Sequence, residues 1–425
     1  MFLHKLPAVR KLPMLALTVG LAASALSACA SDSGNQVEFW TMGLKPQFTG
    51  YMEETIAAFE QAHPGVDVDW VDLPASAIEQ KALSSVAGGN PPDLINLNPA
   101  FSSKLARQGA LLELGAAIPA DVLAQYYPAS LDATRIDGKL YGLPWYLSTQ
   151  VSVFNKGNLE SAGVAELPRT FRELTTHAAS LQKAGFQPFL PSFGDGNKLL
   201  ELMSMDGVAL LSADGKKAAF DTPEGRASFA YWVGLYQDGA IAKESLSLDH
   251  REVVDRFQAG QTTVLPAGPQ FLTLIKQNAP ELYAKLEVGP QLAGTSGKVG
   301  VGVMNLVVPK GAKHQEQAIA LAQFITNAEN QLAFSKLVPN LPSVKAAAQA
   351  EYFTKLPANP TLEDRARQIA AEQLERAELL VPPLPRHDEL AKALNQAFQS
   401  AALGKESPEA ALAKAAADWE RILSK

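Results

Sequence analysis

The stretch "QVEFWTMGLKPQFTGYMEETIAAFEQAHPGVDVDWVDL", residues 36–73, contains two kinds of regular pattern. It opens on a short β-rich run, "QVEFW", and it ends in "VDVDWVDL", whose period-two alternation is typical of a half-buried strand. Between these runs, one face of a predicted helix collects residues at helical spacing: Met52, Thr55, Ile56 and Phe59. Thr49 is the expected N-cap of this helix, and Pro64-Gly65 is its expected stop.

The next segments continue the same alternation. "SAIEQKALSSVAGG", residues 76–89, predicts a second helix, and "PPDLINLN", residues 91–98, predicts a third strand. A β-α-β-α-β series implies an open, mostly parallel sheet covered by helices, which binds ligands at the carboxyl ends of its strands. Trp40 and Asn98 are expected at such ends.

The only cysteine, Cys29, lies within "LAASALSACA", residues 21–30. Basic residues near the start precede a short apolar run that ends in small residues, which is typical of a secretory signal. The tetrapeptide ending in Cys29 resembles the bacterial lipobox, so we expect a signal peptide at 1–28 and an acylated Cys29. Two or more acyl chains would anchor the protein stably. The small polar residues that follow predict a flexible tether at 29–36.

Composition indicates an exported protein with a large core. The length suits two or three domains, and with no second cysteine the core must be held by burial rather than by disulfides. The formal charge is −7, and it becomes −10 when the three positive charges of residues 1–28 are removed. A chain with this negative charge offers no basic surface for binding nucleic acid.

The middle of the chain carries "DGKLYGLPWYLSTQVSVFNKGNLESAGV", residues 137–164. "HPG" and "GNPPD" precede it, and "RFQAG", "PAGPQFL" and "GKESPEAALAKAAADWERIL" follow it. This ordered set resembles the family 1 extracellular solute-binding proteins of bacterial ABC importers, which include the maltose-binding and glycerol-3-phosphate-binding proteins. The resemblance covers essentially all of the chain after the leader, and it depends on the shared order and spacing rather than on any single string.

The resemblance implies an α/β fold of the two-lobed periplasmic-binding-protein type (type II), in which each lobe is a mostly parallel sheet flanked by helices. It implies three hinge crossings, which we place near Thr149, Asn305 and Lys336. The expected N-terminal lobe is 37–148 plus 305–335, and the expected C-terminal lobe is 149–304 plus 336–425. Hinge closure would couple binding to a change of shape.

A sugar site needs aromatic platforms and a few polar partners, because sugars present flat apolar faces ringed by hydroxyls. Strand-end and junction positions suggest Trp40, Trp145 and Tyr146 as platforms, whereas Trp70, Trp232 and Trp419 are expected in the core. Position and resemblance together suggest these further contacts: Lys45, Asn98, Asp195, Asn197, Gly268, Gln270 and Arg386.

One difference from the maltose-binding protein limits the range of expected ligands. Leu44 and Ala100 stand where the maltose-binding protein has an acidic pair, so maltodextrins are not the implied ligand. The polar set is mixed in charge, which favours a neutral disaccharide, oligosaccharide or glycoside. A glycerol phosphodiester or a polyol is the alternative ligand.

The sequence favours a binding protein over an enzyme. Hydrolase and nucleotide-binding motifs are absent, and His387 and Asp388 are interpreted as solvated residues at a helix start. The alternative is an anchored glycoside hydrolase, which needs two carboxylates facing the sugar. We expect no cofactor and no metal.

The expected partners follow from the resemblance. They are a small-molecule sugar, two integral membrane permease proteins with their cytoplasmic ATPase, and the lipid bilayer, reached through Cys29. The protein is expected to be a monomer outside the cytoplasm, anchored to the cell membrane. A role as a sensor partner is a further alternative.

Overall fold

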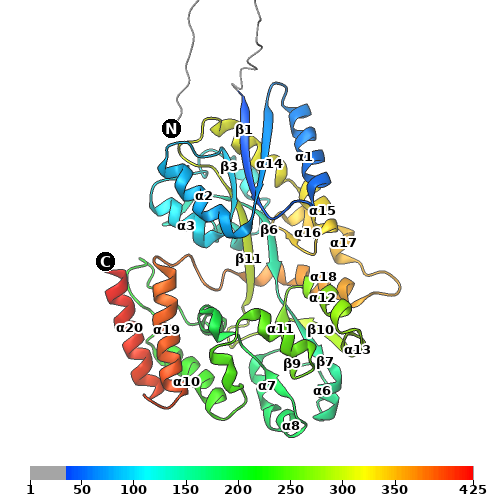
Figure 1. Ribbon diagram of the computed structural model, residues 1–425, viewed down its shortest axis with the longest axis vertical. Coiled ribbons are helices and arrows are strands. Elements are labelled where there is room, and N and C mark those ends of the chain that lie inside the picture. The colour runs from blue at the N-terminus through cyan, green and yellow to red at the C-terminus, as the bar shows by residue number, and fades with distance from the viewer. Residues whose placement is uncertain (1–34, 425) are drawn as a thin grey trace, which may run out of the picture. The chain divides into compact units, whose positions relative to one another are not determined.

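The computed structural model describes residues 35–424. The predicted signal peptide, Cys29 and most of the predicted tether therefore lie outside the described residues. The chain from Asn35 onward forms one compact unit built on two large sheets with flanking helices (Figure 1). No helix among residues 35–424 is long and apolar enough to cross a membrane.

The first sheet contains seven strands in the order β12-β6-β11-β3-β1-β2, with β13 paired to β11. Its strands are β1 (Gln36–Met42), β2 (Asp67–Leu73), β3 (Leu94–Leu97), β6 (Leu143–Thr149), β11 (Val299–Val307), β12 (Leu341–Pro342) and β13 (Ala377–Glu378). β1 pairs in parallel with both β2 and β3, which confirms the predicted β-α-β-α-β series. Asn98 directly follows β3, as predicted for a strand end.

The first helix buries the face that the sequence predicts. α1 (Thr49–Ala62) turns Met52, Thr55, Ile56 and Phe59 into the core. Thr49 is the first residue of the helix rather than its N-cap, and no side-chain cap bond forms. The predicted cap is therefore wrong by one residue, because Phe48 occupies that position.

The second sheet contains four strands in the order β10-β7-β9-β8. They are β7 (Val151–Asn155), β8 (Gln187–Phe189), β9 (Thr262–Ala267) and β10 (Leu286–Pro290). Only β8 and β9 pair in parallel, so the prediction of a mostly parallel sheet is wrong for this part. In the first sheet, β6, β11 and β12 also pair antiparallel. Parallel pairs need helical crossovers within one sheet, whereas β7 and β11 arrive directly from the other sheet.

The chain passes between the sheets at identifiable places. Gln150 alone separates β6 of the first sheet from β7 of the second. β10 belongs to the second sheet, and the next strand, β11, belongs to the first. Asn305 lies inside β11, where pairing with β3 begins and the register with β6 shifts, and Lys336 lies inside a helix, so neither residue is a point where the chain passes from one sheet to the other. β12 pairs with β6 in the first sheet, although it falls within 336–425, a range predicted for the C-terminal lobe.

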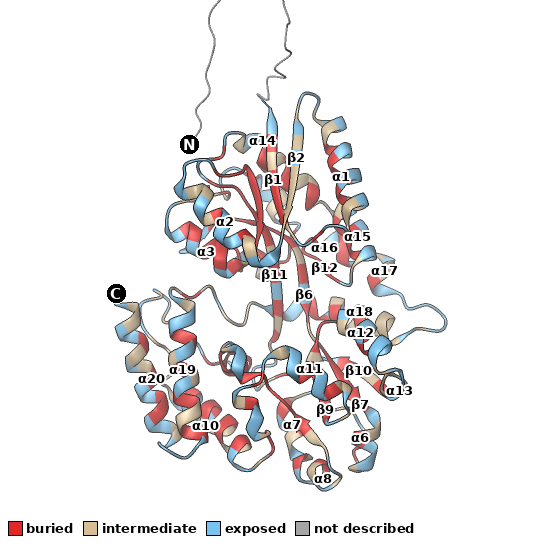
Figure 2. Cartoon of the chain, viewed as in Figure 1, coloured by how far each residue is buried: buried red, intermediate tan, exposed pale blue. Residues whose placement is uncertain are grey.

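Helices cover both sheets and form a further bundle near the C-terminus. The longer helices besides α1 are α2 (Ala75–Ala87), α3 (Pro99–Arg107), α9 (Lys198–Met205), α10 (Pro223–Gln237), α11 (His250–Gln258), α12 (Gln270–Asn278), α14 (Gln315–Ile325), α15 (Ala328–Leu337), α18 (Leu362–Glu372), α19 (His387–Ala402) and α20 (Pro408–Leu423). Figure 2 shows buried residues concentrated along the strands and on the inner faces of these helices. Trp232 and Trp419 are buried in one core cluster, which confirms their predicted core role.

Candidate functional site

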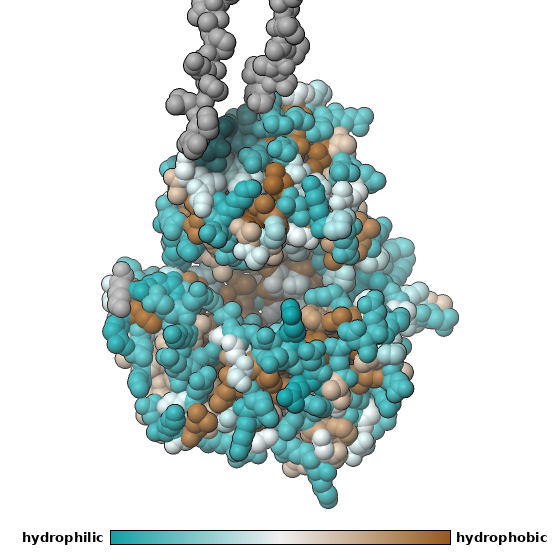
Figure 3. Space-filling view, viewed as in Figure 1, coloured by the Kyte–Doolittle hydropathy of each residue, from teal (hydrophilic) through white to brown (hydrophobic). Residues whose placement is uncertain are grey.

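Three cavities adjoin one another along the segment that leads from β13 to α19. A cavity of about 370 Å³ lies where the two sheets meet, and it shares Leu379 and Leu380 with a cavity of about 930 Å³. That larger cavity shares Arg107 and Pro385 with a third, of about 740 Å³ at the start of α19. We call them the junction pocket, the central cavity and the α19 cavity. Figure 3 shows a mainly hydrophilic face with a recess between the parts that carry the sheets.

The junction pocket is lined by segments far apart in the sequence. They are the end of β6 with Gln150, helix α9, the start of α11, the end of β9 with the following turn and the start of α12, the β11 strand with the preceding Gln291, and the segment after β13. Its polar and aromatic residues are Ser148, Thr149, Gln150, Glu201, His250, Gln270, Phe271 and Gln291. Its volume falls in the range of about 300 to 1,000 Å³ that small-molecule sites occupy.

Strand alternation explains which residues face this pocket. In β6, Leu143, Trp145 and Leu147 are buried, whereas Ser148 is exposed and lines the pocket. In β11, Gly302 pairs with Ser148 and is likewise exposed. Since neighbouring residues of a strand point to opposite faces, the apolar residues fill the core and the small ones leave the pocket open.

His250 supplies the one imidazole of the junction pocket. Its ring lies edge-on to Phe271, with 5.2 Å between ring centroids. Burial lowers the pKa of His250, and the charge of Lys198 lowers it further, against the opposing effects of Asp195, Glu201 and Asp249. His250 is therefore neutral at pH 7, where its two ring nitrogens offer one donor and one acceptor.

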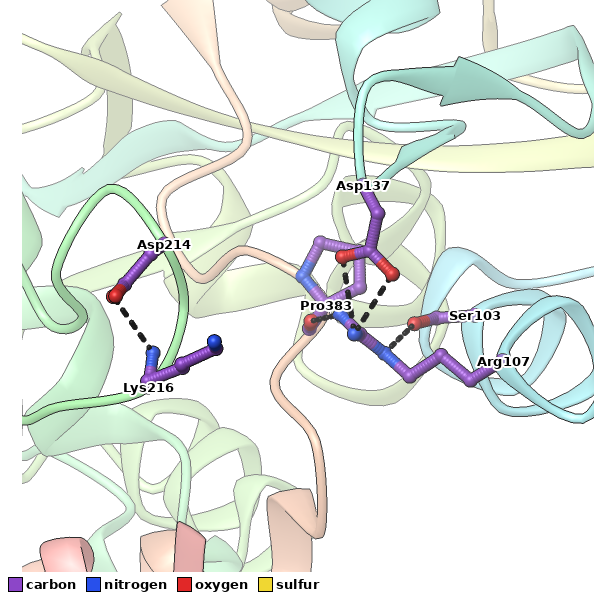
Figure 4. A network of polar contacts seen from close by, with 6 residues as sticks. All are labelled: Ser103, Arg107, Asp137, Asp214, Lys216 and Pro383. Carbon is purple, nitrogen blue, oxygen red and sulfur yellow. Dashed lines mark hydrogen bonds and ion pairs between the residues drawn. The ribbon is translucent and has the colours of Figure 1, made fainter.

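The central cavity is lined by several charged side chains, some of which form ion pairs. Arg107 of α3 forms an ion pair with Asp137 at 3.2 Å, and it also donates to the Pro383 carbonyl oxygen at 3.4 Å (Figure 4). Lys298 pairs with Glu378 at 2.6 Å. Each of these two pairs is neutral, whereas Asp214 and Lys216 also line the cavity and form no ion pair among residues 35–424.

Local sequence explains the position of Asp137. Asp137 and Gly138 form the two-residue turn between β4 (Arg135–Ile136) and β5 (Lys139–Leu140). Both have positive φ, at 51° and 80°, which is the conformation that a type I′ hairpin requires. The turn places the Asp137 carboxylate against Arg107.

The α19 cavity brings together three of the predicted site residues, Asn98, Asn197 and Arg386. Each of the three already has a hydrogen-bond partner within the protein. Asn98 caps α3 by accepting from the Phe101 N–H at 2.8 Å, and Arg386 donates to Glu389 at 2.6 and 2.7 Å. Asn197 Oδ1 lies 2.7 Å from His387 Nε2.

His387 differs from its predicted description as a solvated residue. Besides its contact with Asn197, it is half-buried, and burial lowers its pKa. Asp388 is exposed, as predicted.

The structure contradicts the predicted role of Trp145 as a platform. Its side chain has no exposed surface and stacks on Phe334, with 5.5 Å between centroids and 19° between planes. The physical reason is the β6 alternation, which places Trp145 on the same buried face as Leu143 and Leu147.

Trp40 is also buried, with 4% of its surface exposed. Its Nε1 donates to Glu38 at 2.7 Å, and Lys81 Nζ lies 4.6 Å from the centre of its ring. The predicted platform role of Trp40 is therefore wrong for this structure, because its own strand and α2 cover the ring.

The remaining predicted residues lie in several different places. Gly268 and Gln270 line the junction pocket. Asp195 lines a cavity beside α19, whereas Lys45 is exposed and holds its Nζ 4.2 Å from the centre of the half-buried Trp70 ring. Tyr146 packs edge-on against Trp145, and burial raises its pKa to about 12.

Sequence reasoning missed most of the residues in the junction pocket. Gln150, His250, Phe271 and Gln291 come from four separate segments, and only topology brings them together. One feature of the sequence could have indicated two of them. Gln150 directly follows Thr149, a predicted hinge crossing, and Phe271 directly follows Gln270, a predicted ligand contact.

Acidification is expected to destabilise the protein partly through His250. Because burial lowers its pKa, the unfolded chain, with a pKa near 6.5, binds a proton that the folded chain resists. Stability should therefore fall as the pH drops through about 6.5. Urea unfolding at about pH 7 and about pH 5.5 tests this. The His250→Asn variant should lose less stability on acidification than wild type, and an equal loss would contradict the prediction.

The described residues contain no group of three or more His, Cys, Asp and Glu side chains that could hold a metal ion. The three adjoining cavities instead offer neutral amides, hydroxyls, charged side chains of both signs, and the aromatic rings of Phe271 and Phe101. This arrangement can bind an uncharged polar solute by hydrogen bonding and ring contact.

Several known proteins resemble this chain in sequence and in fold. A crystal structure of a periplasmic-binding protein from Synechococcus sp. MITs9220 is 34% identical, with a TM-score of 0.81, over 91% of this chain and 99% of that one. The galactooligosaccharide-binding protein of Bacillus subtilis is 27% identical over 92% of this chain and 90% of its own length. The sugar-binding protein MalE of Xanthomonas citri, 23% identical over 92% and 98%, shares the fold with a TM-score of 0.77.

The family model for bacterial extracellular solute-binding proteins matches residues 45–332, which include the whole second sheet, strands β2, β3, β6 and β11 of the first sheet, and the junction pocket's β6, β9 and β11 segments. The fold is the α/β periplasmic-binding-protein fold, with two sheets and flanking helices. This chain therefore belongs to the bacterial extracellular solute-binding protein family.

Proposed function

We propose that this protein captures a neutral sugar, either a di- or oligosaccharide or a glycoside, and delivers it to an ABC importer. The observation that carries the proposal is the lining of the junction pocket. It combines amides, hydroxyls and a neutral imidazole with the Phe271 ring, and neither Lys nor Arg lines it. Such a lining suits a polyhydroxylated ligand with flat apolar faces.

The same lining favours a neutral sugar over a glycerol phosphodiester. A glycerol phosphodiester carries a negative charge, and phosphate sites in proteins typically use Arg or Lys. The single carboxylate that lines the pocket, Glu201, is paired with Lys198 at 2.6 Å, and no Lys or Arg lines the pocket to hold a phosphate. The relative from Bacillus subtilis, named for galactooligosaccharides, supports an uncharged sugar.

The protein is not an enzyme, since its family consists of binding proteins. The pocket lining agrees with the family, because a glycoside hydrolase needs two carboxylates facing the sugar and Glu201 is the only one that lines the pocket.

Transport would require the two sheet-bearing parts to close on the ligand as lobes. We place the hinge where β6 leads into β7 and where β10 leads into β11, beside the junction pocket. The closed form would then dock on two permease proteins that work with a cytoplasmic ATPase. Because hinge closure changes the shape of the protein when the pocket is occupied, an importer can distinguish the liganded form from the unliganded form.

Calorimetric titration tests the function. The purified protein, residues 35–425, is titrated with galactooligosaccharides, other disaccharides, polyols and glycerol phosphodiesters. We expect a neutral sugar to bind and to remain chemically intact, and we expect the radius of gyration from X-ray scattering to decrease at saturation. Binding only to phosphodiesters, or to no member of the panel, would overturn the proposal.

The lipid anchor is a separate proposal, supported by the "LSAC" tetrapeptide at residues 26–29. Cys29 would receive the acyl chains and become the mature N-terminus. We expect Cys29→Ser to abolish incorporation of labelled palmitate and to shift the protein out of the membrane fraction. A Ser27→Ala variant, which keeps the thiol and a small residue, is the matched control. A Cys29→Ser protein that still incorporates label would refute the anchor.

A further inference from the structure

Three glutamines meet beside the junction pocket, each where the chain passes between the two sheets. Gln150 separates β6 from β7, and Gln291 directly follows β10. Gln373 follows α18, which packs against β10, and precedes β13, which pairs with β11. Gln150 and Gln291 line the pocket, and Gln373 is buried behind them.

Backbone N–H groups fix the orientation of two of these amides. The Gly300 N–H donates to Gln291 Oε1 at 2.9 Å, so the opposite end of that amide must be its NH₂ group. In the same way, the Gln291 N–H donates to Gln373 Oε1 at 2.7 Å. The Gln373 NH₂ group then donates to the Gln150 carbonyl oxygen at 3.1 Å.

The orientation of Gln150 follows from that of Gln291. Gln291 Nε2 lies 3.3 Å from the Gln150 side chain and can only donate, so the Gln150 atom facing it must be its acceptor, Oε1. The Gln150 NH₂ group is then turned away from the cluster. No residue among 35–424 accepts a hydrogen bond from it, and the Gln150 side chain is half-exposed on the pocket wall.

We propose that Gln150 is a ligand-binding residue whose NH₂ group donates to an acceptor oxygen of the sugar, and that Gln291 is the positioning residue that sets its orientation. This inference rests on the proposed function, since it names a contact within the same pocket. A hydroxyl or ring oxygen, or the carbonyl oxygen of an acetamido group, would meet the donor. Hydrogen bonds among the three glutamines connect the segments that pass between the two sheets. A sugar bound to Gln150 would therefore also be connected to the proposed hinge.

Gln150→Glu tests the donor directly. Glutamate can still accept from Gln291 but cannot donate to the sugar, and its size is almost unchanged. We expect the tightest-binding sugar of the titration panel to bind about ten-fold more weakly or worse, while the melting temperature of the apo protein changes little. Gln277→Glu, an exposed glutamine of α12 that lies outside the pocket, adds the same charge and should leave affinity unchanged.

A double-mutant cycle tests the positioning role. Gln291→Glu can accept from Gly300 but cannot donate to Gln150, so it should turn the Gln150 amide round and weaken binding in the wild-type background. In a Gln150→Ala background, Gln291→Glu should have little further effect on affinity, whereas a merely structural role would weaken binding equally in both.

The possible outcomes separate the two proposals. If wild type binds a sugar and Gln150→Glu binds it equally well, the inference is wrong and the proposed function stands. If wild type binds no sugar of the panel, the proposed function fails and the inference fails with it.

Discussion

Replacing Trp145 with alanine is expected to lower the free energy of unfolding by about 3 to 5 kcal/mol, the usual cost of truncating a large core aromatic. The Trp145 ring has no exposed surface and stacks on Phe334 with 19° between ring planes. Its loss would leave a cavity between β6 and α15, where Phe39, Tyr146 and Phe334 also pack.

Urea unfolding of the purified protein would measure this effect, with Phe271→Ala as the matched control. Phe271 is only partly buried, at the edge of its core cluster, so its truncation should cost much less stability. It should instead weaken sugar binding by about 2 kcal/mol or more, as expected for an aromatic anchor. If Trp145→Ala unfolds like wild type but binds sugar poorly, the ring lines the site and its core assignment is wrong.

Trp145 shows why sequence located some features and not others. The β-α-β-α-β series was predictable because each element carries its own periodicity, and the Met52 and Phe59 face of α1 is where the pattern placed it. Trp145 was assigned to the site because of its position in a junction motif. The period of β6 was the better guide, since Leu143, Trp145 and Leu147 alternate and share one buried face.

The junction pocket could not be predicted in the same way, because it depends on contacts between distant segments. Gln150 and Gln291 lie 141 residues apart, yet their side chains are 3.3 Å apart. No local pattern marks a glutamine as a pocket residue, since most glutamines are exposed. The antiparallel pairing in the second sheet was not predicted for a related reason. β7 pairs antiparallel with its neighbours because it enters from another sheet, and local periodicity does not record such an entry.

Strand β11 provides the most direct way to block the pocket. Gly302 is exposed on the pocket side, and its φ does not fall in the left-handed region, so the backbone accepts a side chain there. A Cβ at this position would lie 2.6 Å from Ser148 Oγ, the end of a short exposed side chain that can rotate away. A bulky residue at 302 would therefore project into the 370 Å³ cavity without displacing the core.

Gly302→Phe is accordingly expected to weaken sugar binding about hundred-fold, equivalent to about 2.8 kcal/mol, because the ring would occupy the space that the ligand needs. The melting temperature of the apo protein should change little. Gly50→Phe is the matched control, since a Cβ at Gly50 on the exposed side of α1 meets nothing within 4 Å. Calorimetric titration compares the two variants. Normal affinity in Gly302→Phe would mean that the sugar binds elsewhere, and the α19 cavity, which already holds Asn98, Asn197 and Arg386, would then be the site to test.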